Sequence, residues 1–357
     1  MEEIIELLRG TLTVDELERI EKAPFREREH PLRRLLRWQT SIGAEYGNTL
    51  FALKTVLKSD PEWLTSKRRK ERLLDVHEYH NPAGVLAELR TYGSLLMAGF
   101  EARPVPETST RTPDFEVDGP EDSVVEVEVF AKSYPVDEAK SLEAFYNMPP
   151  PSVVDERVAV REHTVRPFKA NGVNLSHPAV VAKILSMKKQ GEQLSGSCPG
   201  ILWLDLQGEL WQLYPWTDSC LPITVDRNGF HSGGLWYAFF GQENDPIFER
   251  HIPWPFDQRV DFAPGICSMS HSGRFKQDRA LSGVVVSSDS FLALFENPDA
   301  VQPLEEWFWR RATALRWFDI SRSWIGWPAK DLPERLAIER RRLHALMDLR
   351  EPPVASP

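Results

Sequence analysis

The sequence predicts an α/β protein with helical regions at both ends. Apolar residues recur at helical spacing over residues 1 to about 80, and helical spacing returns after residue 303. Between these regions, short segments with strand-like alternation and buried-strand composition predict a central sheet. The chain has 357 residues, which is enough for one large domain with additions or for two domains.

Composition narrows the class of protein. Hydrophobic residues make up 41% of the chain and charged residues 27%, as in ordinary globular proteins. The net charge of -10 argues against a wholesale basic coat for nucleic acid, but it permits a local basic groove. Three widely spaced cysteines indicate reduced thiols in a cytoplasmic protein. No apolar stretch approaches the roughly 18 residues that span a bilayer, so we expect no membrane segment.

Residues 1–80 are expected to be helical. Thr13-Val-Asp-Glu16 fits a capping box at a helix start, and Pro31 suits the first turn of another helix. The basic run Lys67-Arg68-Arg69-Lys70, with Arg72, has two interpretations. It is either a phosphate-contacting patch or a solvated helix face, and the second is favoured.

His77 and His80 lie three residues apart, a spacing that can ligate a metal from one helix face. No cysteine or third histidine completes such a set. We therefore favour the interpretation that the two histidines end a helix, where positive charge meets the last carbonyls.

The next helix is predicted over residues 83–99. Its apolar stripe has Glu88 beside it, and Gly99 suits its C-cap. A strand is expected at about residues 100–105. This order matters because it places an acidic helix residue directly before the strands described next.

Residues 112–132 predict a β-hairpin with a turn at Asp118-Gly119-Pro120. Alternation sends Glu126 and Glu128 to the same face of the second strand, and Asp114 lies on the first strand. Three carboxylates that converge are favoured when a cation lies among them, which predicts a metal site. Alternatively, the valines between these residues face a core while both glutamates face water.

The order of these features resembles the PD-(D/E)xK superfamily. The resemblance rests on Glu88, Pro113-Asp114-Phe115 and Glu126-Val127-Glu128, and it covers residues 82 to about 206 best. It implies a restriction-endonuclease-like mixed-sheet core flanked by helices. It also implies that Glu88, Asp114 and Glu126 hold Mg²⁺, or Mn²⁺ in its place.

The sequence departs from the family pattern at the lysine that usually ends the third motif. Glu128 occupies that position here. Lys132 has the same strand parity but lies roughly 13 Å farther along the strand at about 3.3 Å per residue. Lys183, Lys189 and Gln190 follow on a predicted helix, and either of these two lysines is an alternative source of the ammonium group.

Downstream segments complete the predicted core. Residues 200–206 have the composition of a buried central strand, and residues 282–298 predict one or two closing strands. His251, His271 and Arg274 could line a pocket, although no spacing singles them out. The predicted regions are a helical N-terminal region (1–80), a PD-(D/E)xK-like core (81–300) with insertions near 134–176 and 208–280, a helical C-terminal region (301–350, with helices at 303–318 and 333–350) and a disordered tail (351–357).

These features predict a metal-dependent endonuclease that hydrolyses phosphodiester bonds, with catalytic candidates Asp114, Glu126, Glu128, Glu88, Lys132 and Lys189. Its expected partner is nucleic acid, with DNA favoured, and a protein partner or a homo-oligomer is an open alternative. A second hypothesis is a catalytically inactive nuclease-fold module that binds nucleic acid or protein. A third is an interaction scaffold whose acidic strand faces only solvent.

Overall fold

The chain packs as two compact units in a computed structural model. The structure describes residues 2–25, 29–37, 44–106, 112–131, 144, 193–207, 220–226, 229–248, 266–269, 271–288, 290–326 and 331–348. The helical unit comprises Met1–Leu96 and Ala131–Asn174, and the sheet unit comprises Met97–Phe130 and Leu175–Pro357.

The helical unit is built from short helices around an apolar core. The predicted capping box is confirmed, since Thr13 Oγ1 accepts from Glu16 N (3.3 Å) and Glu16 Oε2 accepts from Thr13 N (2.8 Å). Pro31 occupies the first turn of its helix, also as predicted. The helices are α1 (Glu2–Gly10), α2 (Val14–Glu21), α3 (Pro31–Leu36), α4 (Ala44–Ser59), α5 (Glu62–Thr65), α6 (Lys67–Leu73) and α7 (His80–Met97).

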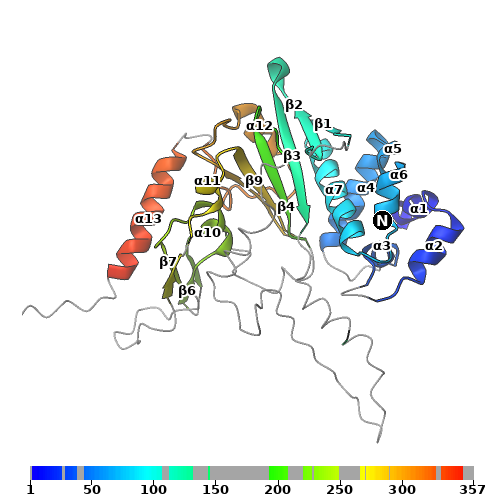
Figure 1. The fold of residues 1–357 in the computed structure, drawn as a ribbon, viewed down its shortest axis with the longest axis horizontal. Coiled ribbons are helices and arrows are strands. Elements are labelled where there is room, and N and C mark those ends of the chain that lie inside the picture. Colours follow the sequence, from blue (N-terminus) through cyan, green and yellow to red (C-terminus); the bar gives the residue numbers. More distant parts are fainter. Residues whose placement is uncertain are drawn as a thin grey trace, which may run out of the picture. The chain divides into compact units, whose positions relative to one another are not determined.

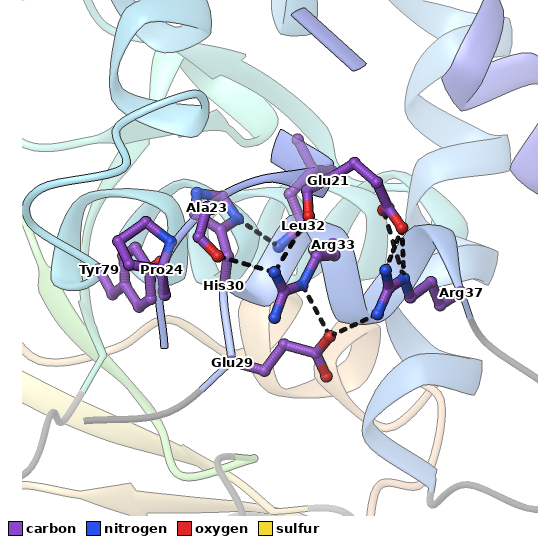
Figure 2. Close-up of polar contacts among 9 residues, drawn as sticks. All are labelled: Glu21, Ala23, Pro24, Glu29, His30, Leu32, Arg33, Arg37 and Tyr79. Atoms are coloured by element: carbon purple, nitrogen blue, oxygen red, sulfur yellow. Dashed lines mark hydrogen bonds and ion pairs between the residues drawn. The ribbon is translucent and has the colours of Figure 1, made fainter. Parts of the chain in front are cut away.

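Two arginines of α3 hold the connection that follows α2 (Figure 2). Arg33 donates to the backbone carbonyls of Glu21 (3.2 Å) and Ala23 (2.7 Å) and to the carboxylate of Glu29 (2.8 Å). Arg37 donates through Nε to the Glu21 carboxylate (2.9 Å). The Arg33 guanidinium thereby satisfies carbonyls that the end of α2 leaves without helical partners, whereas Arg37 pairs with the Glu21 side chain.

A buried histidine starts α3. His30 is fully buried, and its Nδ1 accepts from Leu32 N (3.2 Å) at the helix start. Its Nε2 donates to the Asp75 carbonyl (3.1 Å), and its ring meets the edge of the Tyr79 ring at 4.9 Å. Tyr79 in turn donates to the Pro24 carbonyl (Figure 2). These contacts tie the start of α3 to the turn before α7.

The sheet unit is built on a six-stranded mixed sheet in the order β1-β2-β3-β4-β9-β10 (Figure 1). The β1–β2, β2–β3 and β9–β10 pairs are antiparallel, whereas β4 and β9 are parallel. Helices of the same unit flank the sheet, so the predicted α/β class is confirmed. The strands are β1 (Glu101–Pro104), β2 (Phe115–Asp118), β3 (Val124–Ala131), β4 (Gly200–Asp205), β9 (Leu281–Ser287) and β10 (Leu292–Glu296).

Smaller elements surround the sheet. Strand β5 pairs with β6, and β7 pairs with β8, both in antiparallel fashion. These elements are the strands β5 (Thr224–Asp226), β6 (Gly229–His231), β7 (Pro246–Phe248) and β8 (Ile266–Ser268), the 3-10 turn η1 (Pro120–Asp122), and the helices α10 (Gly234–Phe240), α11 (Arg274–Gln277), α12 (Glu306–Ala312) and α13 (Leu332–Asp348).

An aromatic layer holds α10 and α11 on the sheet. Phe275 of α11 stacks on Phe239 of α10, with ring centroids 5.6 Å apart. Phe239 packs on Phe295 of β10 at 5.0 Å, and Phe240 packs on the same ring at 5.9 Å. Figure 1 shows both helices beside the sheet. These large apolar contacts place the first residue of α11, Arg274, on the sheet.

The segment after α12 covers the β10 edge of the sheet. Leu292 N donates to the Trp317 carbonyl, and Asp319 N donates to the Leu292 carbonyl, both at 2.8 Å. Glu296 N donates to the Trp324 carbonyl at 2.8 Å. The predicted helix over 303–318 is therefore wrong beyond Ala312, because pairing with the strand edge replaces helical hydrogen bonds there.

Helix α13 packs on other elements of the sheet unit through a buried charge. Asp245 is 2% exposed and lies 3.4 Å from Arg340 Nε and 3.3 Å from His344 Nε2. Arg335 lies over the Trp324 ring at 4.0 Å. The Arg335 cation–π contact and the Arg340 ion pair thus join α13 to the rest of the sheet unit.

Candidate carboxylate site on the β2–β3 hairpin

The predicted hairpin is confirmed, and its register sets the direction of its acidic side chains. Phe115 pairs with Val127 and Glu116 pairs with Glu126. Alternation sends Glu126 and Glu128 to one face of β3, away from the buried Phe115 and Val127. Glu126 is nevertheless only 6% exposed and Glu128 only 2%. The hypothesis of an acidic strand that faces only solvent is therefore wrong.

Asp114 lies beside β3 at the point where β2 begins. Its backbone N–H donates to the Val127 carbonyl (3.0 Å), and its Oδ2 accepts from Val129 N (2.6 Å). Pro113 has no N–H to extend the ladder. These bonds hold the Asp114 carboxylate along β3, next to the position of Glu128. We call Asp114, Glu126 and Glu128 the carboxylate site.

The loop before β4 orients Glu126. Its Oε2 accepts from Ser195 N (2.6 Å), and its own N–H donates to the Pro199 carbonyl (2.9 Å). Gly196 has a φ of 70°, a conformation that glycine adopts without strain, and this lets the loop turn. Burial, together with the Glu126 charge, raises the pKa of the Cys198 thiol. Cys198 therefore lies near Glu126 as a neutral thiol.

Arg274 is a buried cation of the sheet unit. It is 4% exposed, and its charge interacts with those of Asp278 and Glu128. Burial lowers the pKa of Arg274 to about 10, against the opposing effect of these two negative charges. The guanidinium therefore stays protonated at neutral pH. No spacing in the Gly273-Arg274-Phe275 segment indicates this electrostatic interaction.

Glu116 lies on the same face of the sheet as Glu126, but its carboxylate pairs with the exposed Arg103. Its Oε2 accepts from Arg103 Nη2 (2.5 Å) and Nε (3.1 Å), and Arg103 also lies 3.3 Å from Asp118. This exposed ion pair is an ordinary surface arrangement. Glu116 is therefore left out of the carboxylate site.

Glu88 belongs to the helical unit, where it is 8% exposed on α7. Arg72 Nη2 lies 2.8 Å from its Oε1, and Arg69 Nε lies 3.9 Å from its Oε2. Lys70, between these two arginines, pairs with Glu16 at 2.9 Å. Three residues of the basic run thus form ion pairs within the helical unit. Neither the phosphate-contacting nor the solvated interpretation of the run predicted these pairs. The role of Glu88 as a metal ligand stays a prediction.

The remaining candidates fall in two groups. Lys132, Lys183, Lys189 and Gln190 lie outside the described residues, so their roles stay predictions. His77 and His80 do not share or end one helix, because α6 ends at Leu73 and α7 begins at His80. His80 instead pairs with the exposed carboxylate of Glu78 at 3.1 Å.

The donor chemistry of the carboxylate site fits a hard cation. Mg²⁺ prefers oxygen ligands and is usually held by one or two carboxylates, with waters and substrate phosphates completing its shell. Asp114 and Glu126 provide such oxygens. Among the residues that the structure describes, no three His, Cys, Asp or Glu side chains are arranged to hold a metal. The fit therefore rests on the donor chemistry of Asp114 and Glu126, each of which has one oxygen oriented by a backbone N–H.

Comparison of the chain with protein-family models, curated proteins and solved structures finds no match. None of the helices in the described part of the chain has the length and apolarity needed to cross a membrane.

Proposed function

We propose that the protein is a metal-dependent, nuclease-like hydrolase that cuts phosphodiester bonds of nucleic acid at the carboxylate site, with DNA as the favoured substrate. The observation that carries the proposal is the burial of Glu126 and Glu128 on one face of β3, beside Asp114. Carboxylates without a function usually remain hydrated at the surface, whereas those of functional sites are often buried.

The order of elements supports a restriction-endonuclease-like core. An acidic helix residue, Glu88, is followed by β1, β2 and β3, which are neighbours in that order in the sheet. Asp114 lies at the start of β2, and Glu126 lies on β3. The resemblance to PD-(D/E)xK proteins rests on this order of features along the chain. The three strands are also neighbours in the sheet, which supports the same core. Fold similarity by itself does not establish activity.

The chemistry assigned to each residue follows from its contacts. A backbone N–H fixes one oxygen of Asp114 and one of Glu126, and such bonds orient carboxylates that hold a metal. When bound, a divalent cation stabilises charge at the phosphate and promotes ionisation of water near neutral pH. Glu128 lies on the same face of β3 as Glu126 and is buried there.

The second candidate is a catalytically inactive module with the same core that binds nucleic acid or protein. Glu128, at the position where the family pattern has lysine, favours this candidate. It predicts that the folded protein cuts no substrate but still binds nucleic acid, which a gel-shift assay detects as reduced mobility.

A cleavage assay tests the first candidate. Supercoiled, linear and single-stranded DNA, and RNA, are incubated with Mg²⁺ or Mn²⁺ and the parent protein. We expect Asp114→Asn and Glu126→Gln each to lower the rate by at least about 100-fold, because each removes a charged ligand.

Glu116→Gln is the matched control, since Glu116 lies opposite Glu126 but pairs with Arg103. Its cleavage rate should stay within about threefold of the parent rate, as for a surface ion pair. Absence of metal-dependent cutting by a folded parent on every substrate would reject the nuclease proposal and leave the inactive module.

A further inference from the structure

We propose that the Trp317 ring and the Arg316 guanidinium form a stacking platform for single-stranded nucleic acid at the β10 edge of the sheet. We call these two side chains the edge platform. The inference goes beyond the proposed function, because it assigns a second binding site on a part of the sheet other than the β2–β3 hairpin. It shares with the proposed function the premise that the protein binds nucleic acid, and it does not depend on cleavage.

Trp317 is exposed, unlike the tryptophans that pack in the core of the sheet unit. Its exposed fraction is 51%, whereas Trp203 of β4 and Trp324 beside β10 are each 1% exposed. One exposed apolar side chain is not unusual by itself. Two further observations, on the backbone and on the charges around the ring, distinguish Trp317 from an ordinary surface residue.

The backbone holds Trp317 in a conformation that tryptophan rarely adopts. Its φ is 66°, in the left-handed region, where a bulky side chain is strained. Leu292 N of β10 donates to the Trp317 carbonyl, and Asp319 N donates to the Leu292 carbonyl, both at 2.8 Å. Phe318 N donates to the Leu315 carbonyl at 3.0 Å. Such strain persists where surrounding bonds fix the backbone, and it is concentrated at functional and ligand-binding sites.

The charges around the ring favour an anionic partner. The guanidinium of Arg316 lies over the Trp317 ring, 5.1 Å from the ring centroid. Residues 311–322 contain three arginines and one acidic residue, although the whole chain carries a net charge of -10. Arg311 donates to the Gly99 carbonyl, a neutral acceptor that does not cancel its charge. A locally basic surface on an acidic protein attracts a polyanion, and arginine is well suited to phosphate.

An exposed indole beside arginines matches the chemistry of an unpaired nucleic-acid strand. Every base has a π face that can stack on an aromatic ring, so this contact tolerates any sequence. An arginine next to the ring can bind a phosphate of the same strand. In a duplex the bases are already stacked on one another, and exposing one face costs unstacking energy. The edge platform should therefore prefer single strands.

Binding of fluorescein-labelled oligothymidine and oligouridine, each of about 12 nucleotides, tests the inference. Fluorescence anisotropy is measured in EDTA, so that metal-dependent cleavage cannot occur. We expect Trp317→Leu to weaken binding at least about tenfold, and Trp317→Phe by less than about fivefold, because phenylalanine keeps a ring for stacking. Ile320→Ala is the matched apolar control, since Ile320 is 53% exposed, and its binding should stay within about twofold of the parent.

Salt dependence of the same binding tests the role of Arg316. Arg316→Gln should reduce the slope of log affinity against log salt by about 0.7, the value for one phosphate contact on a single strand. Arg310→Gln is the matched control, because Arg310 is exposed and pairs with Glu306 at 2.6 Å. Its slope should match that of the parent. An equal change in both variants, or no change in Arg316→Gln, would remove Arg316 from the edge platform.

Three results would overturn the inference, with thermal unfolding midpoints showing that each variant is folded. The parent could bind neither oligonucleotide. Trp317→Leu could bind as tightly as the parent, or Ile320→Ala could lose as much affinity as Trp317→Leu, which would indicate apolar contact without stacking. Finally, the parent could prefer oligothymidine annealed to oligoadenosine over oligothymidine alone.

The inference and the nuclease proposal fail in distinguishable ways. If the parent cuts nucleic acid but Trp317→Leu binds single strands like the parent, the nuclease proposal stands and this inference alone is rejected. If the parent binds single strands through Trp317 but cuts no substrate, the edge platform stands and the nuclease proposal alone is rejected.

Discussion

Glu296 offers a quantitative test of how charge is buried in the sheet unit. It ends β10, is 8% exposed, and accepts from Gly326 N through Oε2 at 2.7 Å. Burial raises the pKa of Glu296 from 4.5 to about 7, partly opposed by the hydrogen bond from Gly326. The folded protein therefore binds a proton more tightly at this site than the unfolded chain does.

The sign and size of the effect follow from linkage. A raised folded-state pKa contributes stability that is fully present below pH 4.5 and is lost as the pH rises through about 7. The difference of about 2.5 pKa units, at about 1.36 kcal/mol per unit, corresponds to about 3 kcal/mol. Glu296→Gln removes the charge and keeps an oxygen that accepts from Gly326.

We expect Glu296→Gln to raise the free energy of unfolding by about 3 kcal/mol at pH 8 and by less than about 1 kcal/mol at pH 5. Guanidinium denaturation measures this free energy of unfolding. Tryptophan fluorescence can follow it, because Trp324 lies beside β10, where its backbone carbonyl accepts a hydrogen bond from Glu296 N. Glu243→Gln, at an exposed position, is the control and should change neither value. An equal gain at both pH values, or no gain at pH 8, would refute the reasoning.

Three further predictions concern packing and ion pairs. Arg72→Met should lower the free energy of unfolding by about 3 kcal/mol, because it removes the nearer of the two arginines that pair with the buried Glu88 carboxylate and leaves Arg69 at 3.9 Å. Unchanged denaturant unfolding would contradict this. Gly119→Ala should cost about 1–3 kcal/mol in thermal unfolding, because the new methyl group would overlap the Trp307 ring; a parent-like midpoint would show that the ring moves freely. Asp245→Asn should speed hydrogen exchange in α13, because it removes the ion pair of Asp245 with Arg340. Exchange at the parent rate would exclude a role for this ion pair in docking the helix.

Features set by local sequence were predictable. The capping box of α2, the β2–β3 hairpin and the fully buried strand β4 are all confirmed, because each depends on neighbouring residues. The two closing strands β9 and β10 are confirmed as an antiparallel pair. Gly99 adopts a φ of 77° just after α7, as a C-cap glycine does.

Features set by distant contacts were not predictable. The sequence cannot show that Arg72 reaches Glu88, because this pair joins separate elements. Alternation correctly gave Glu126 and Glu128 the same face, but it could not show that both side chains are buried there. The helical pattern continues after Ala312, but the chain there forms hydrogen bonds with β10 instead of a helix, because tertiary contacts often override local propensity.

Cation binding tests the central claim most directly. Free Mn²⁺ is measured by electron paramagnetic resonance in titrations of the parent protein and of the Asp114→Asn/Glu126→Gln double variant, with unfolding curves showing that both are folded. We expect the parent to bind Mn²⁺, Mg²⁺ to compete for the site, and the variant to bind Mn²⁺ at least about tenfold more weakly. A folded parent that binds no Mn²⁺, or a double variant that binds as tightly as the parent, would contradict it.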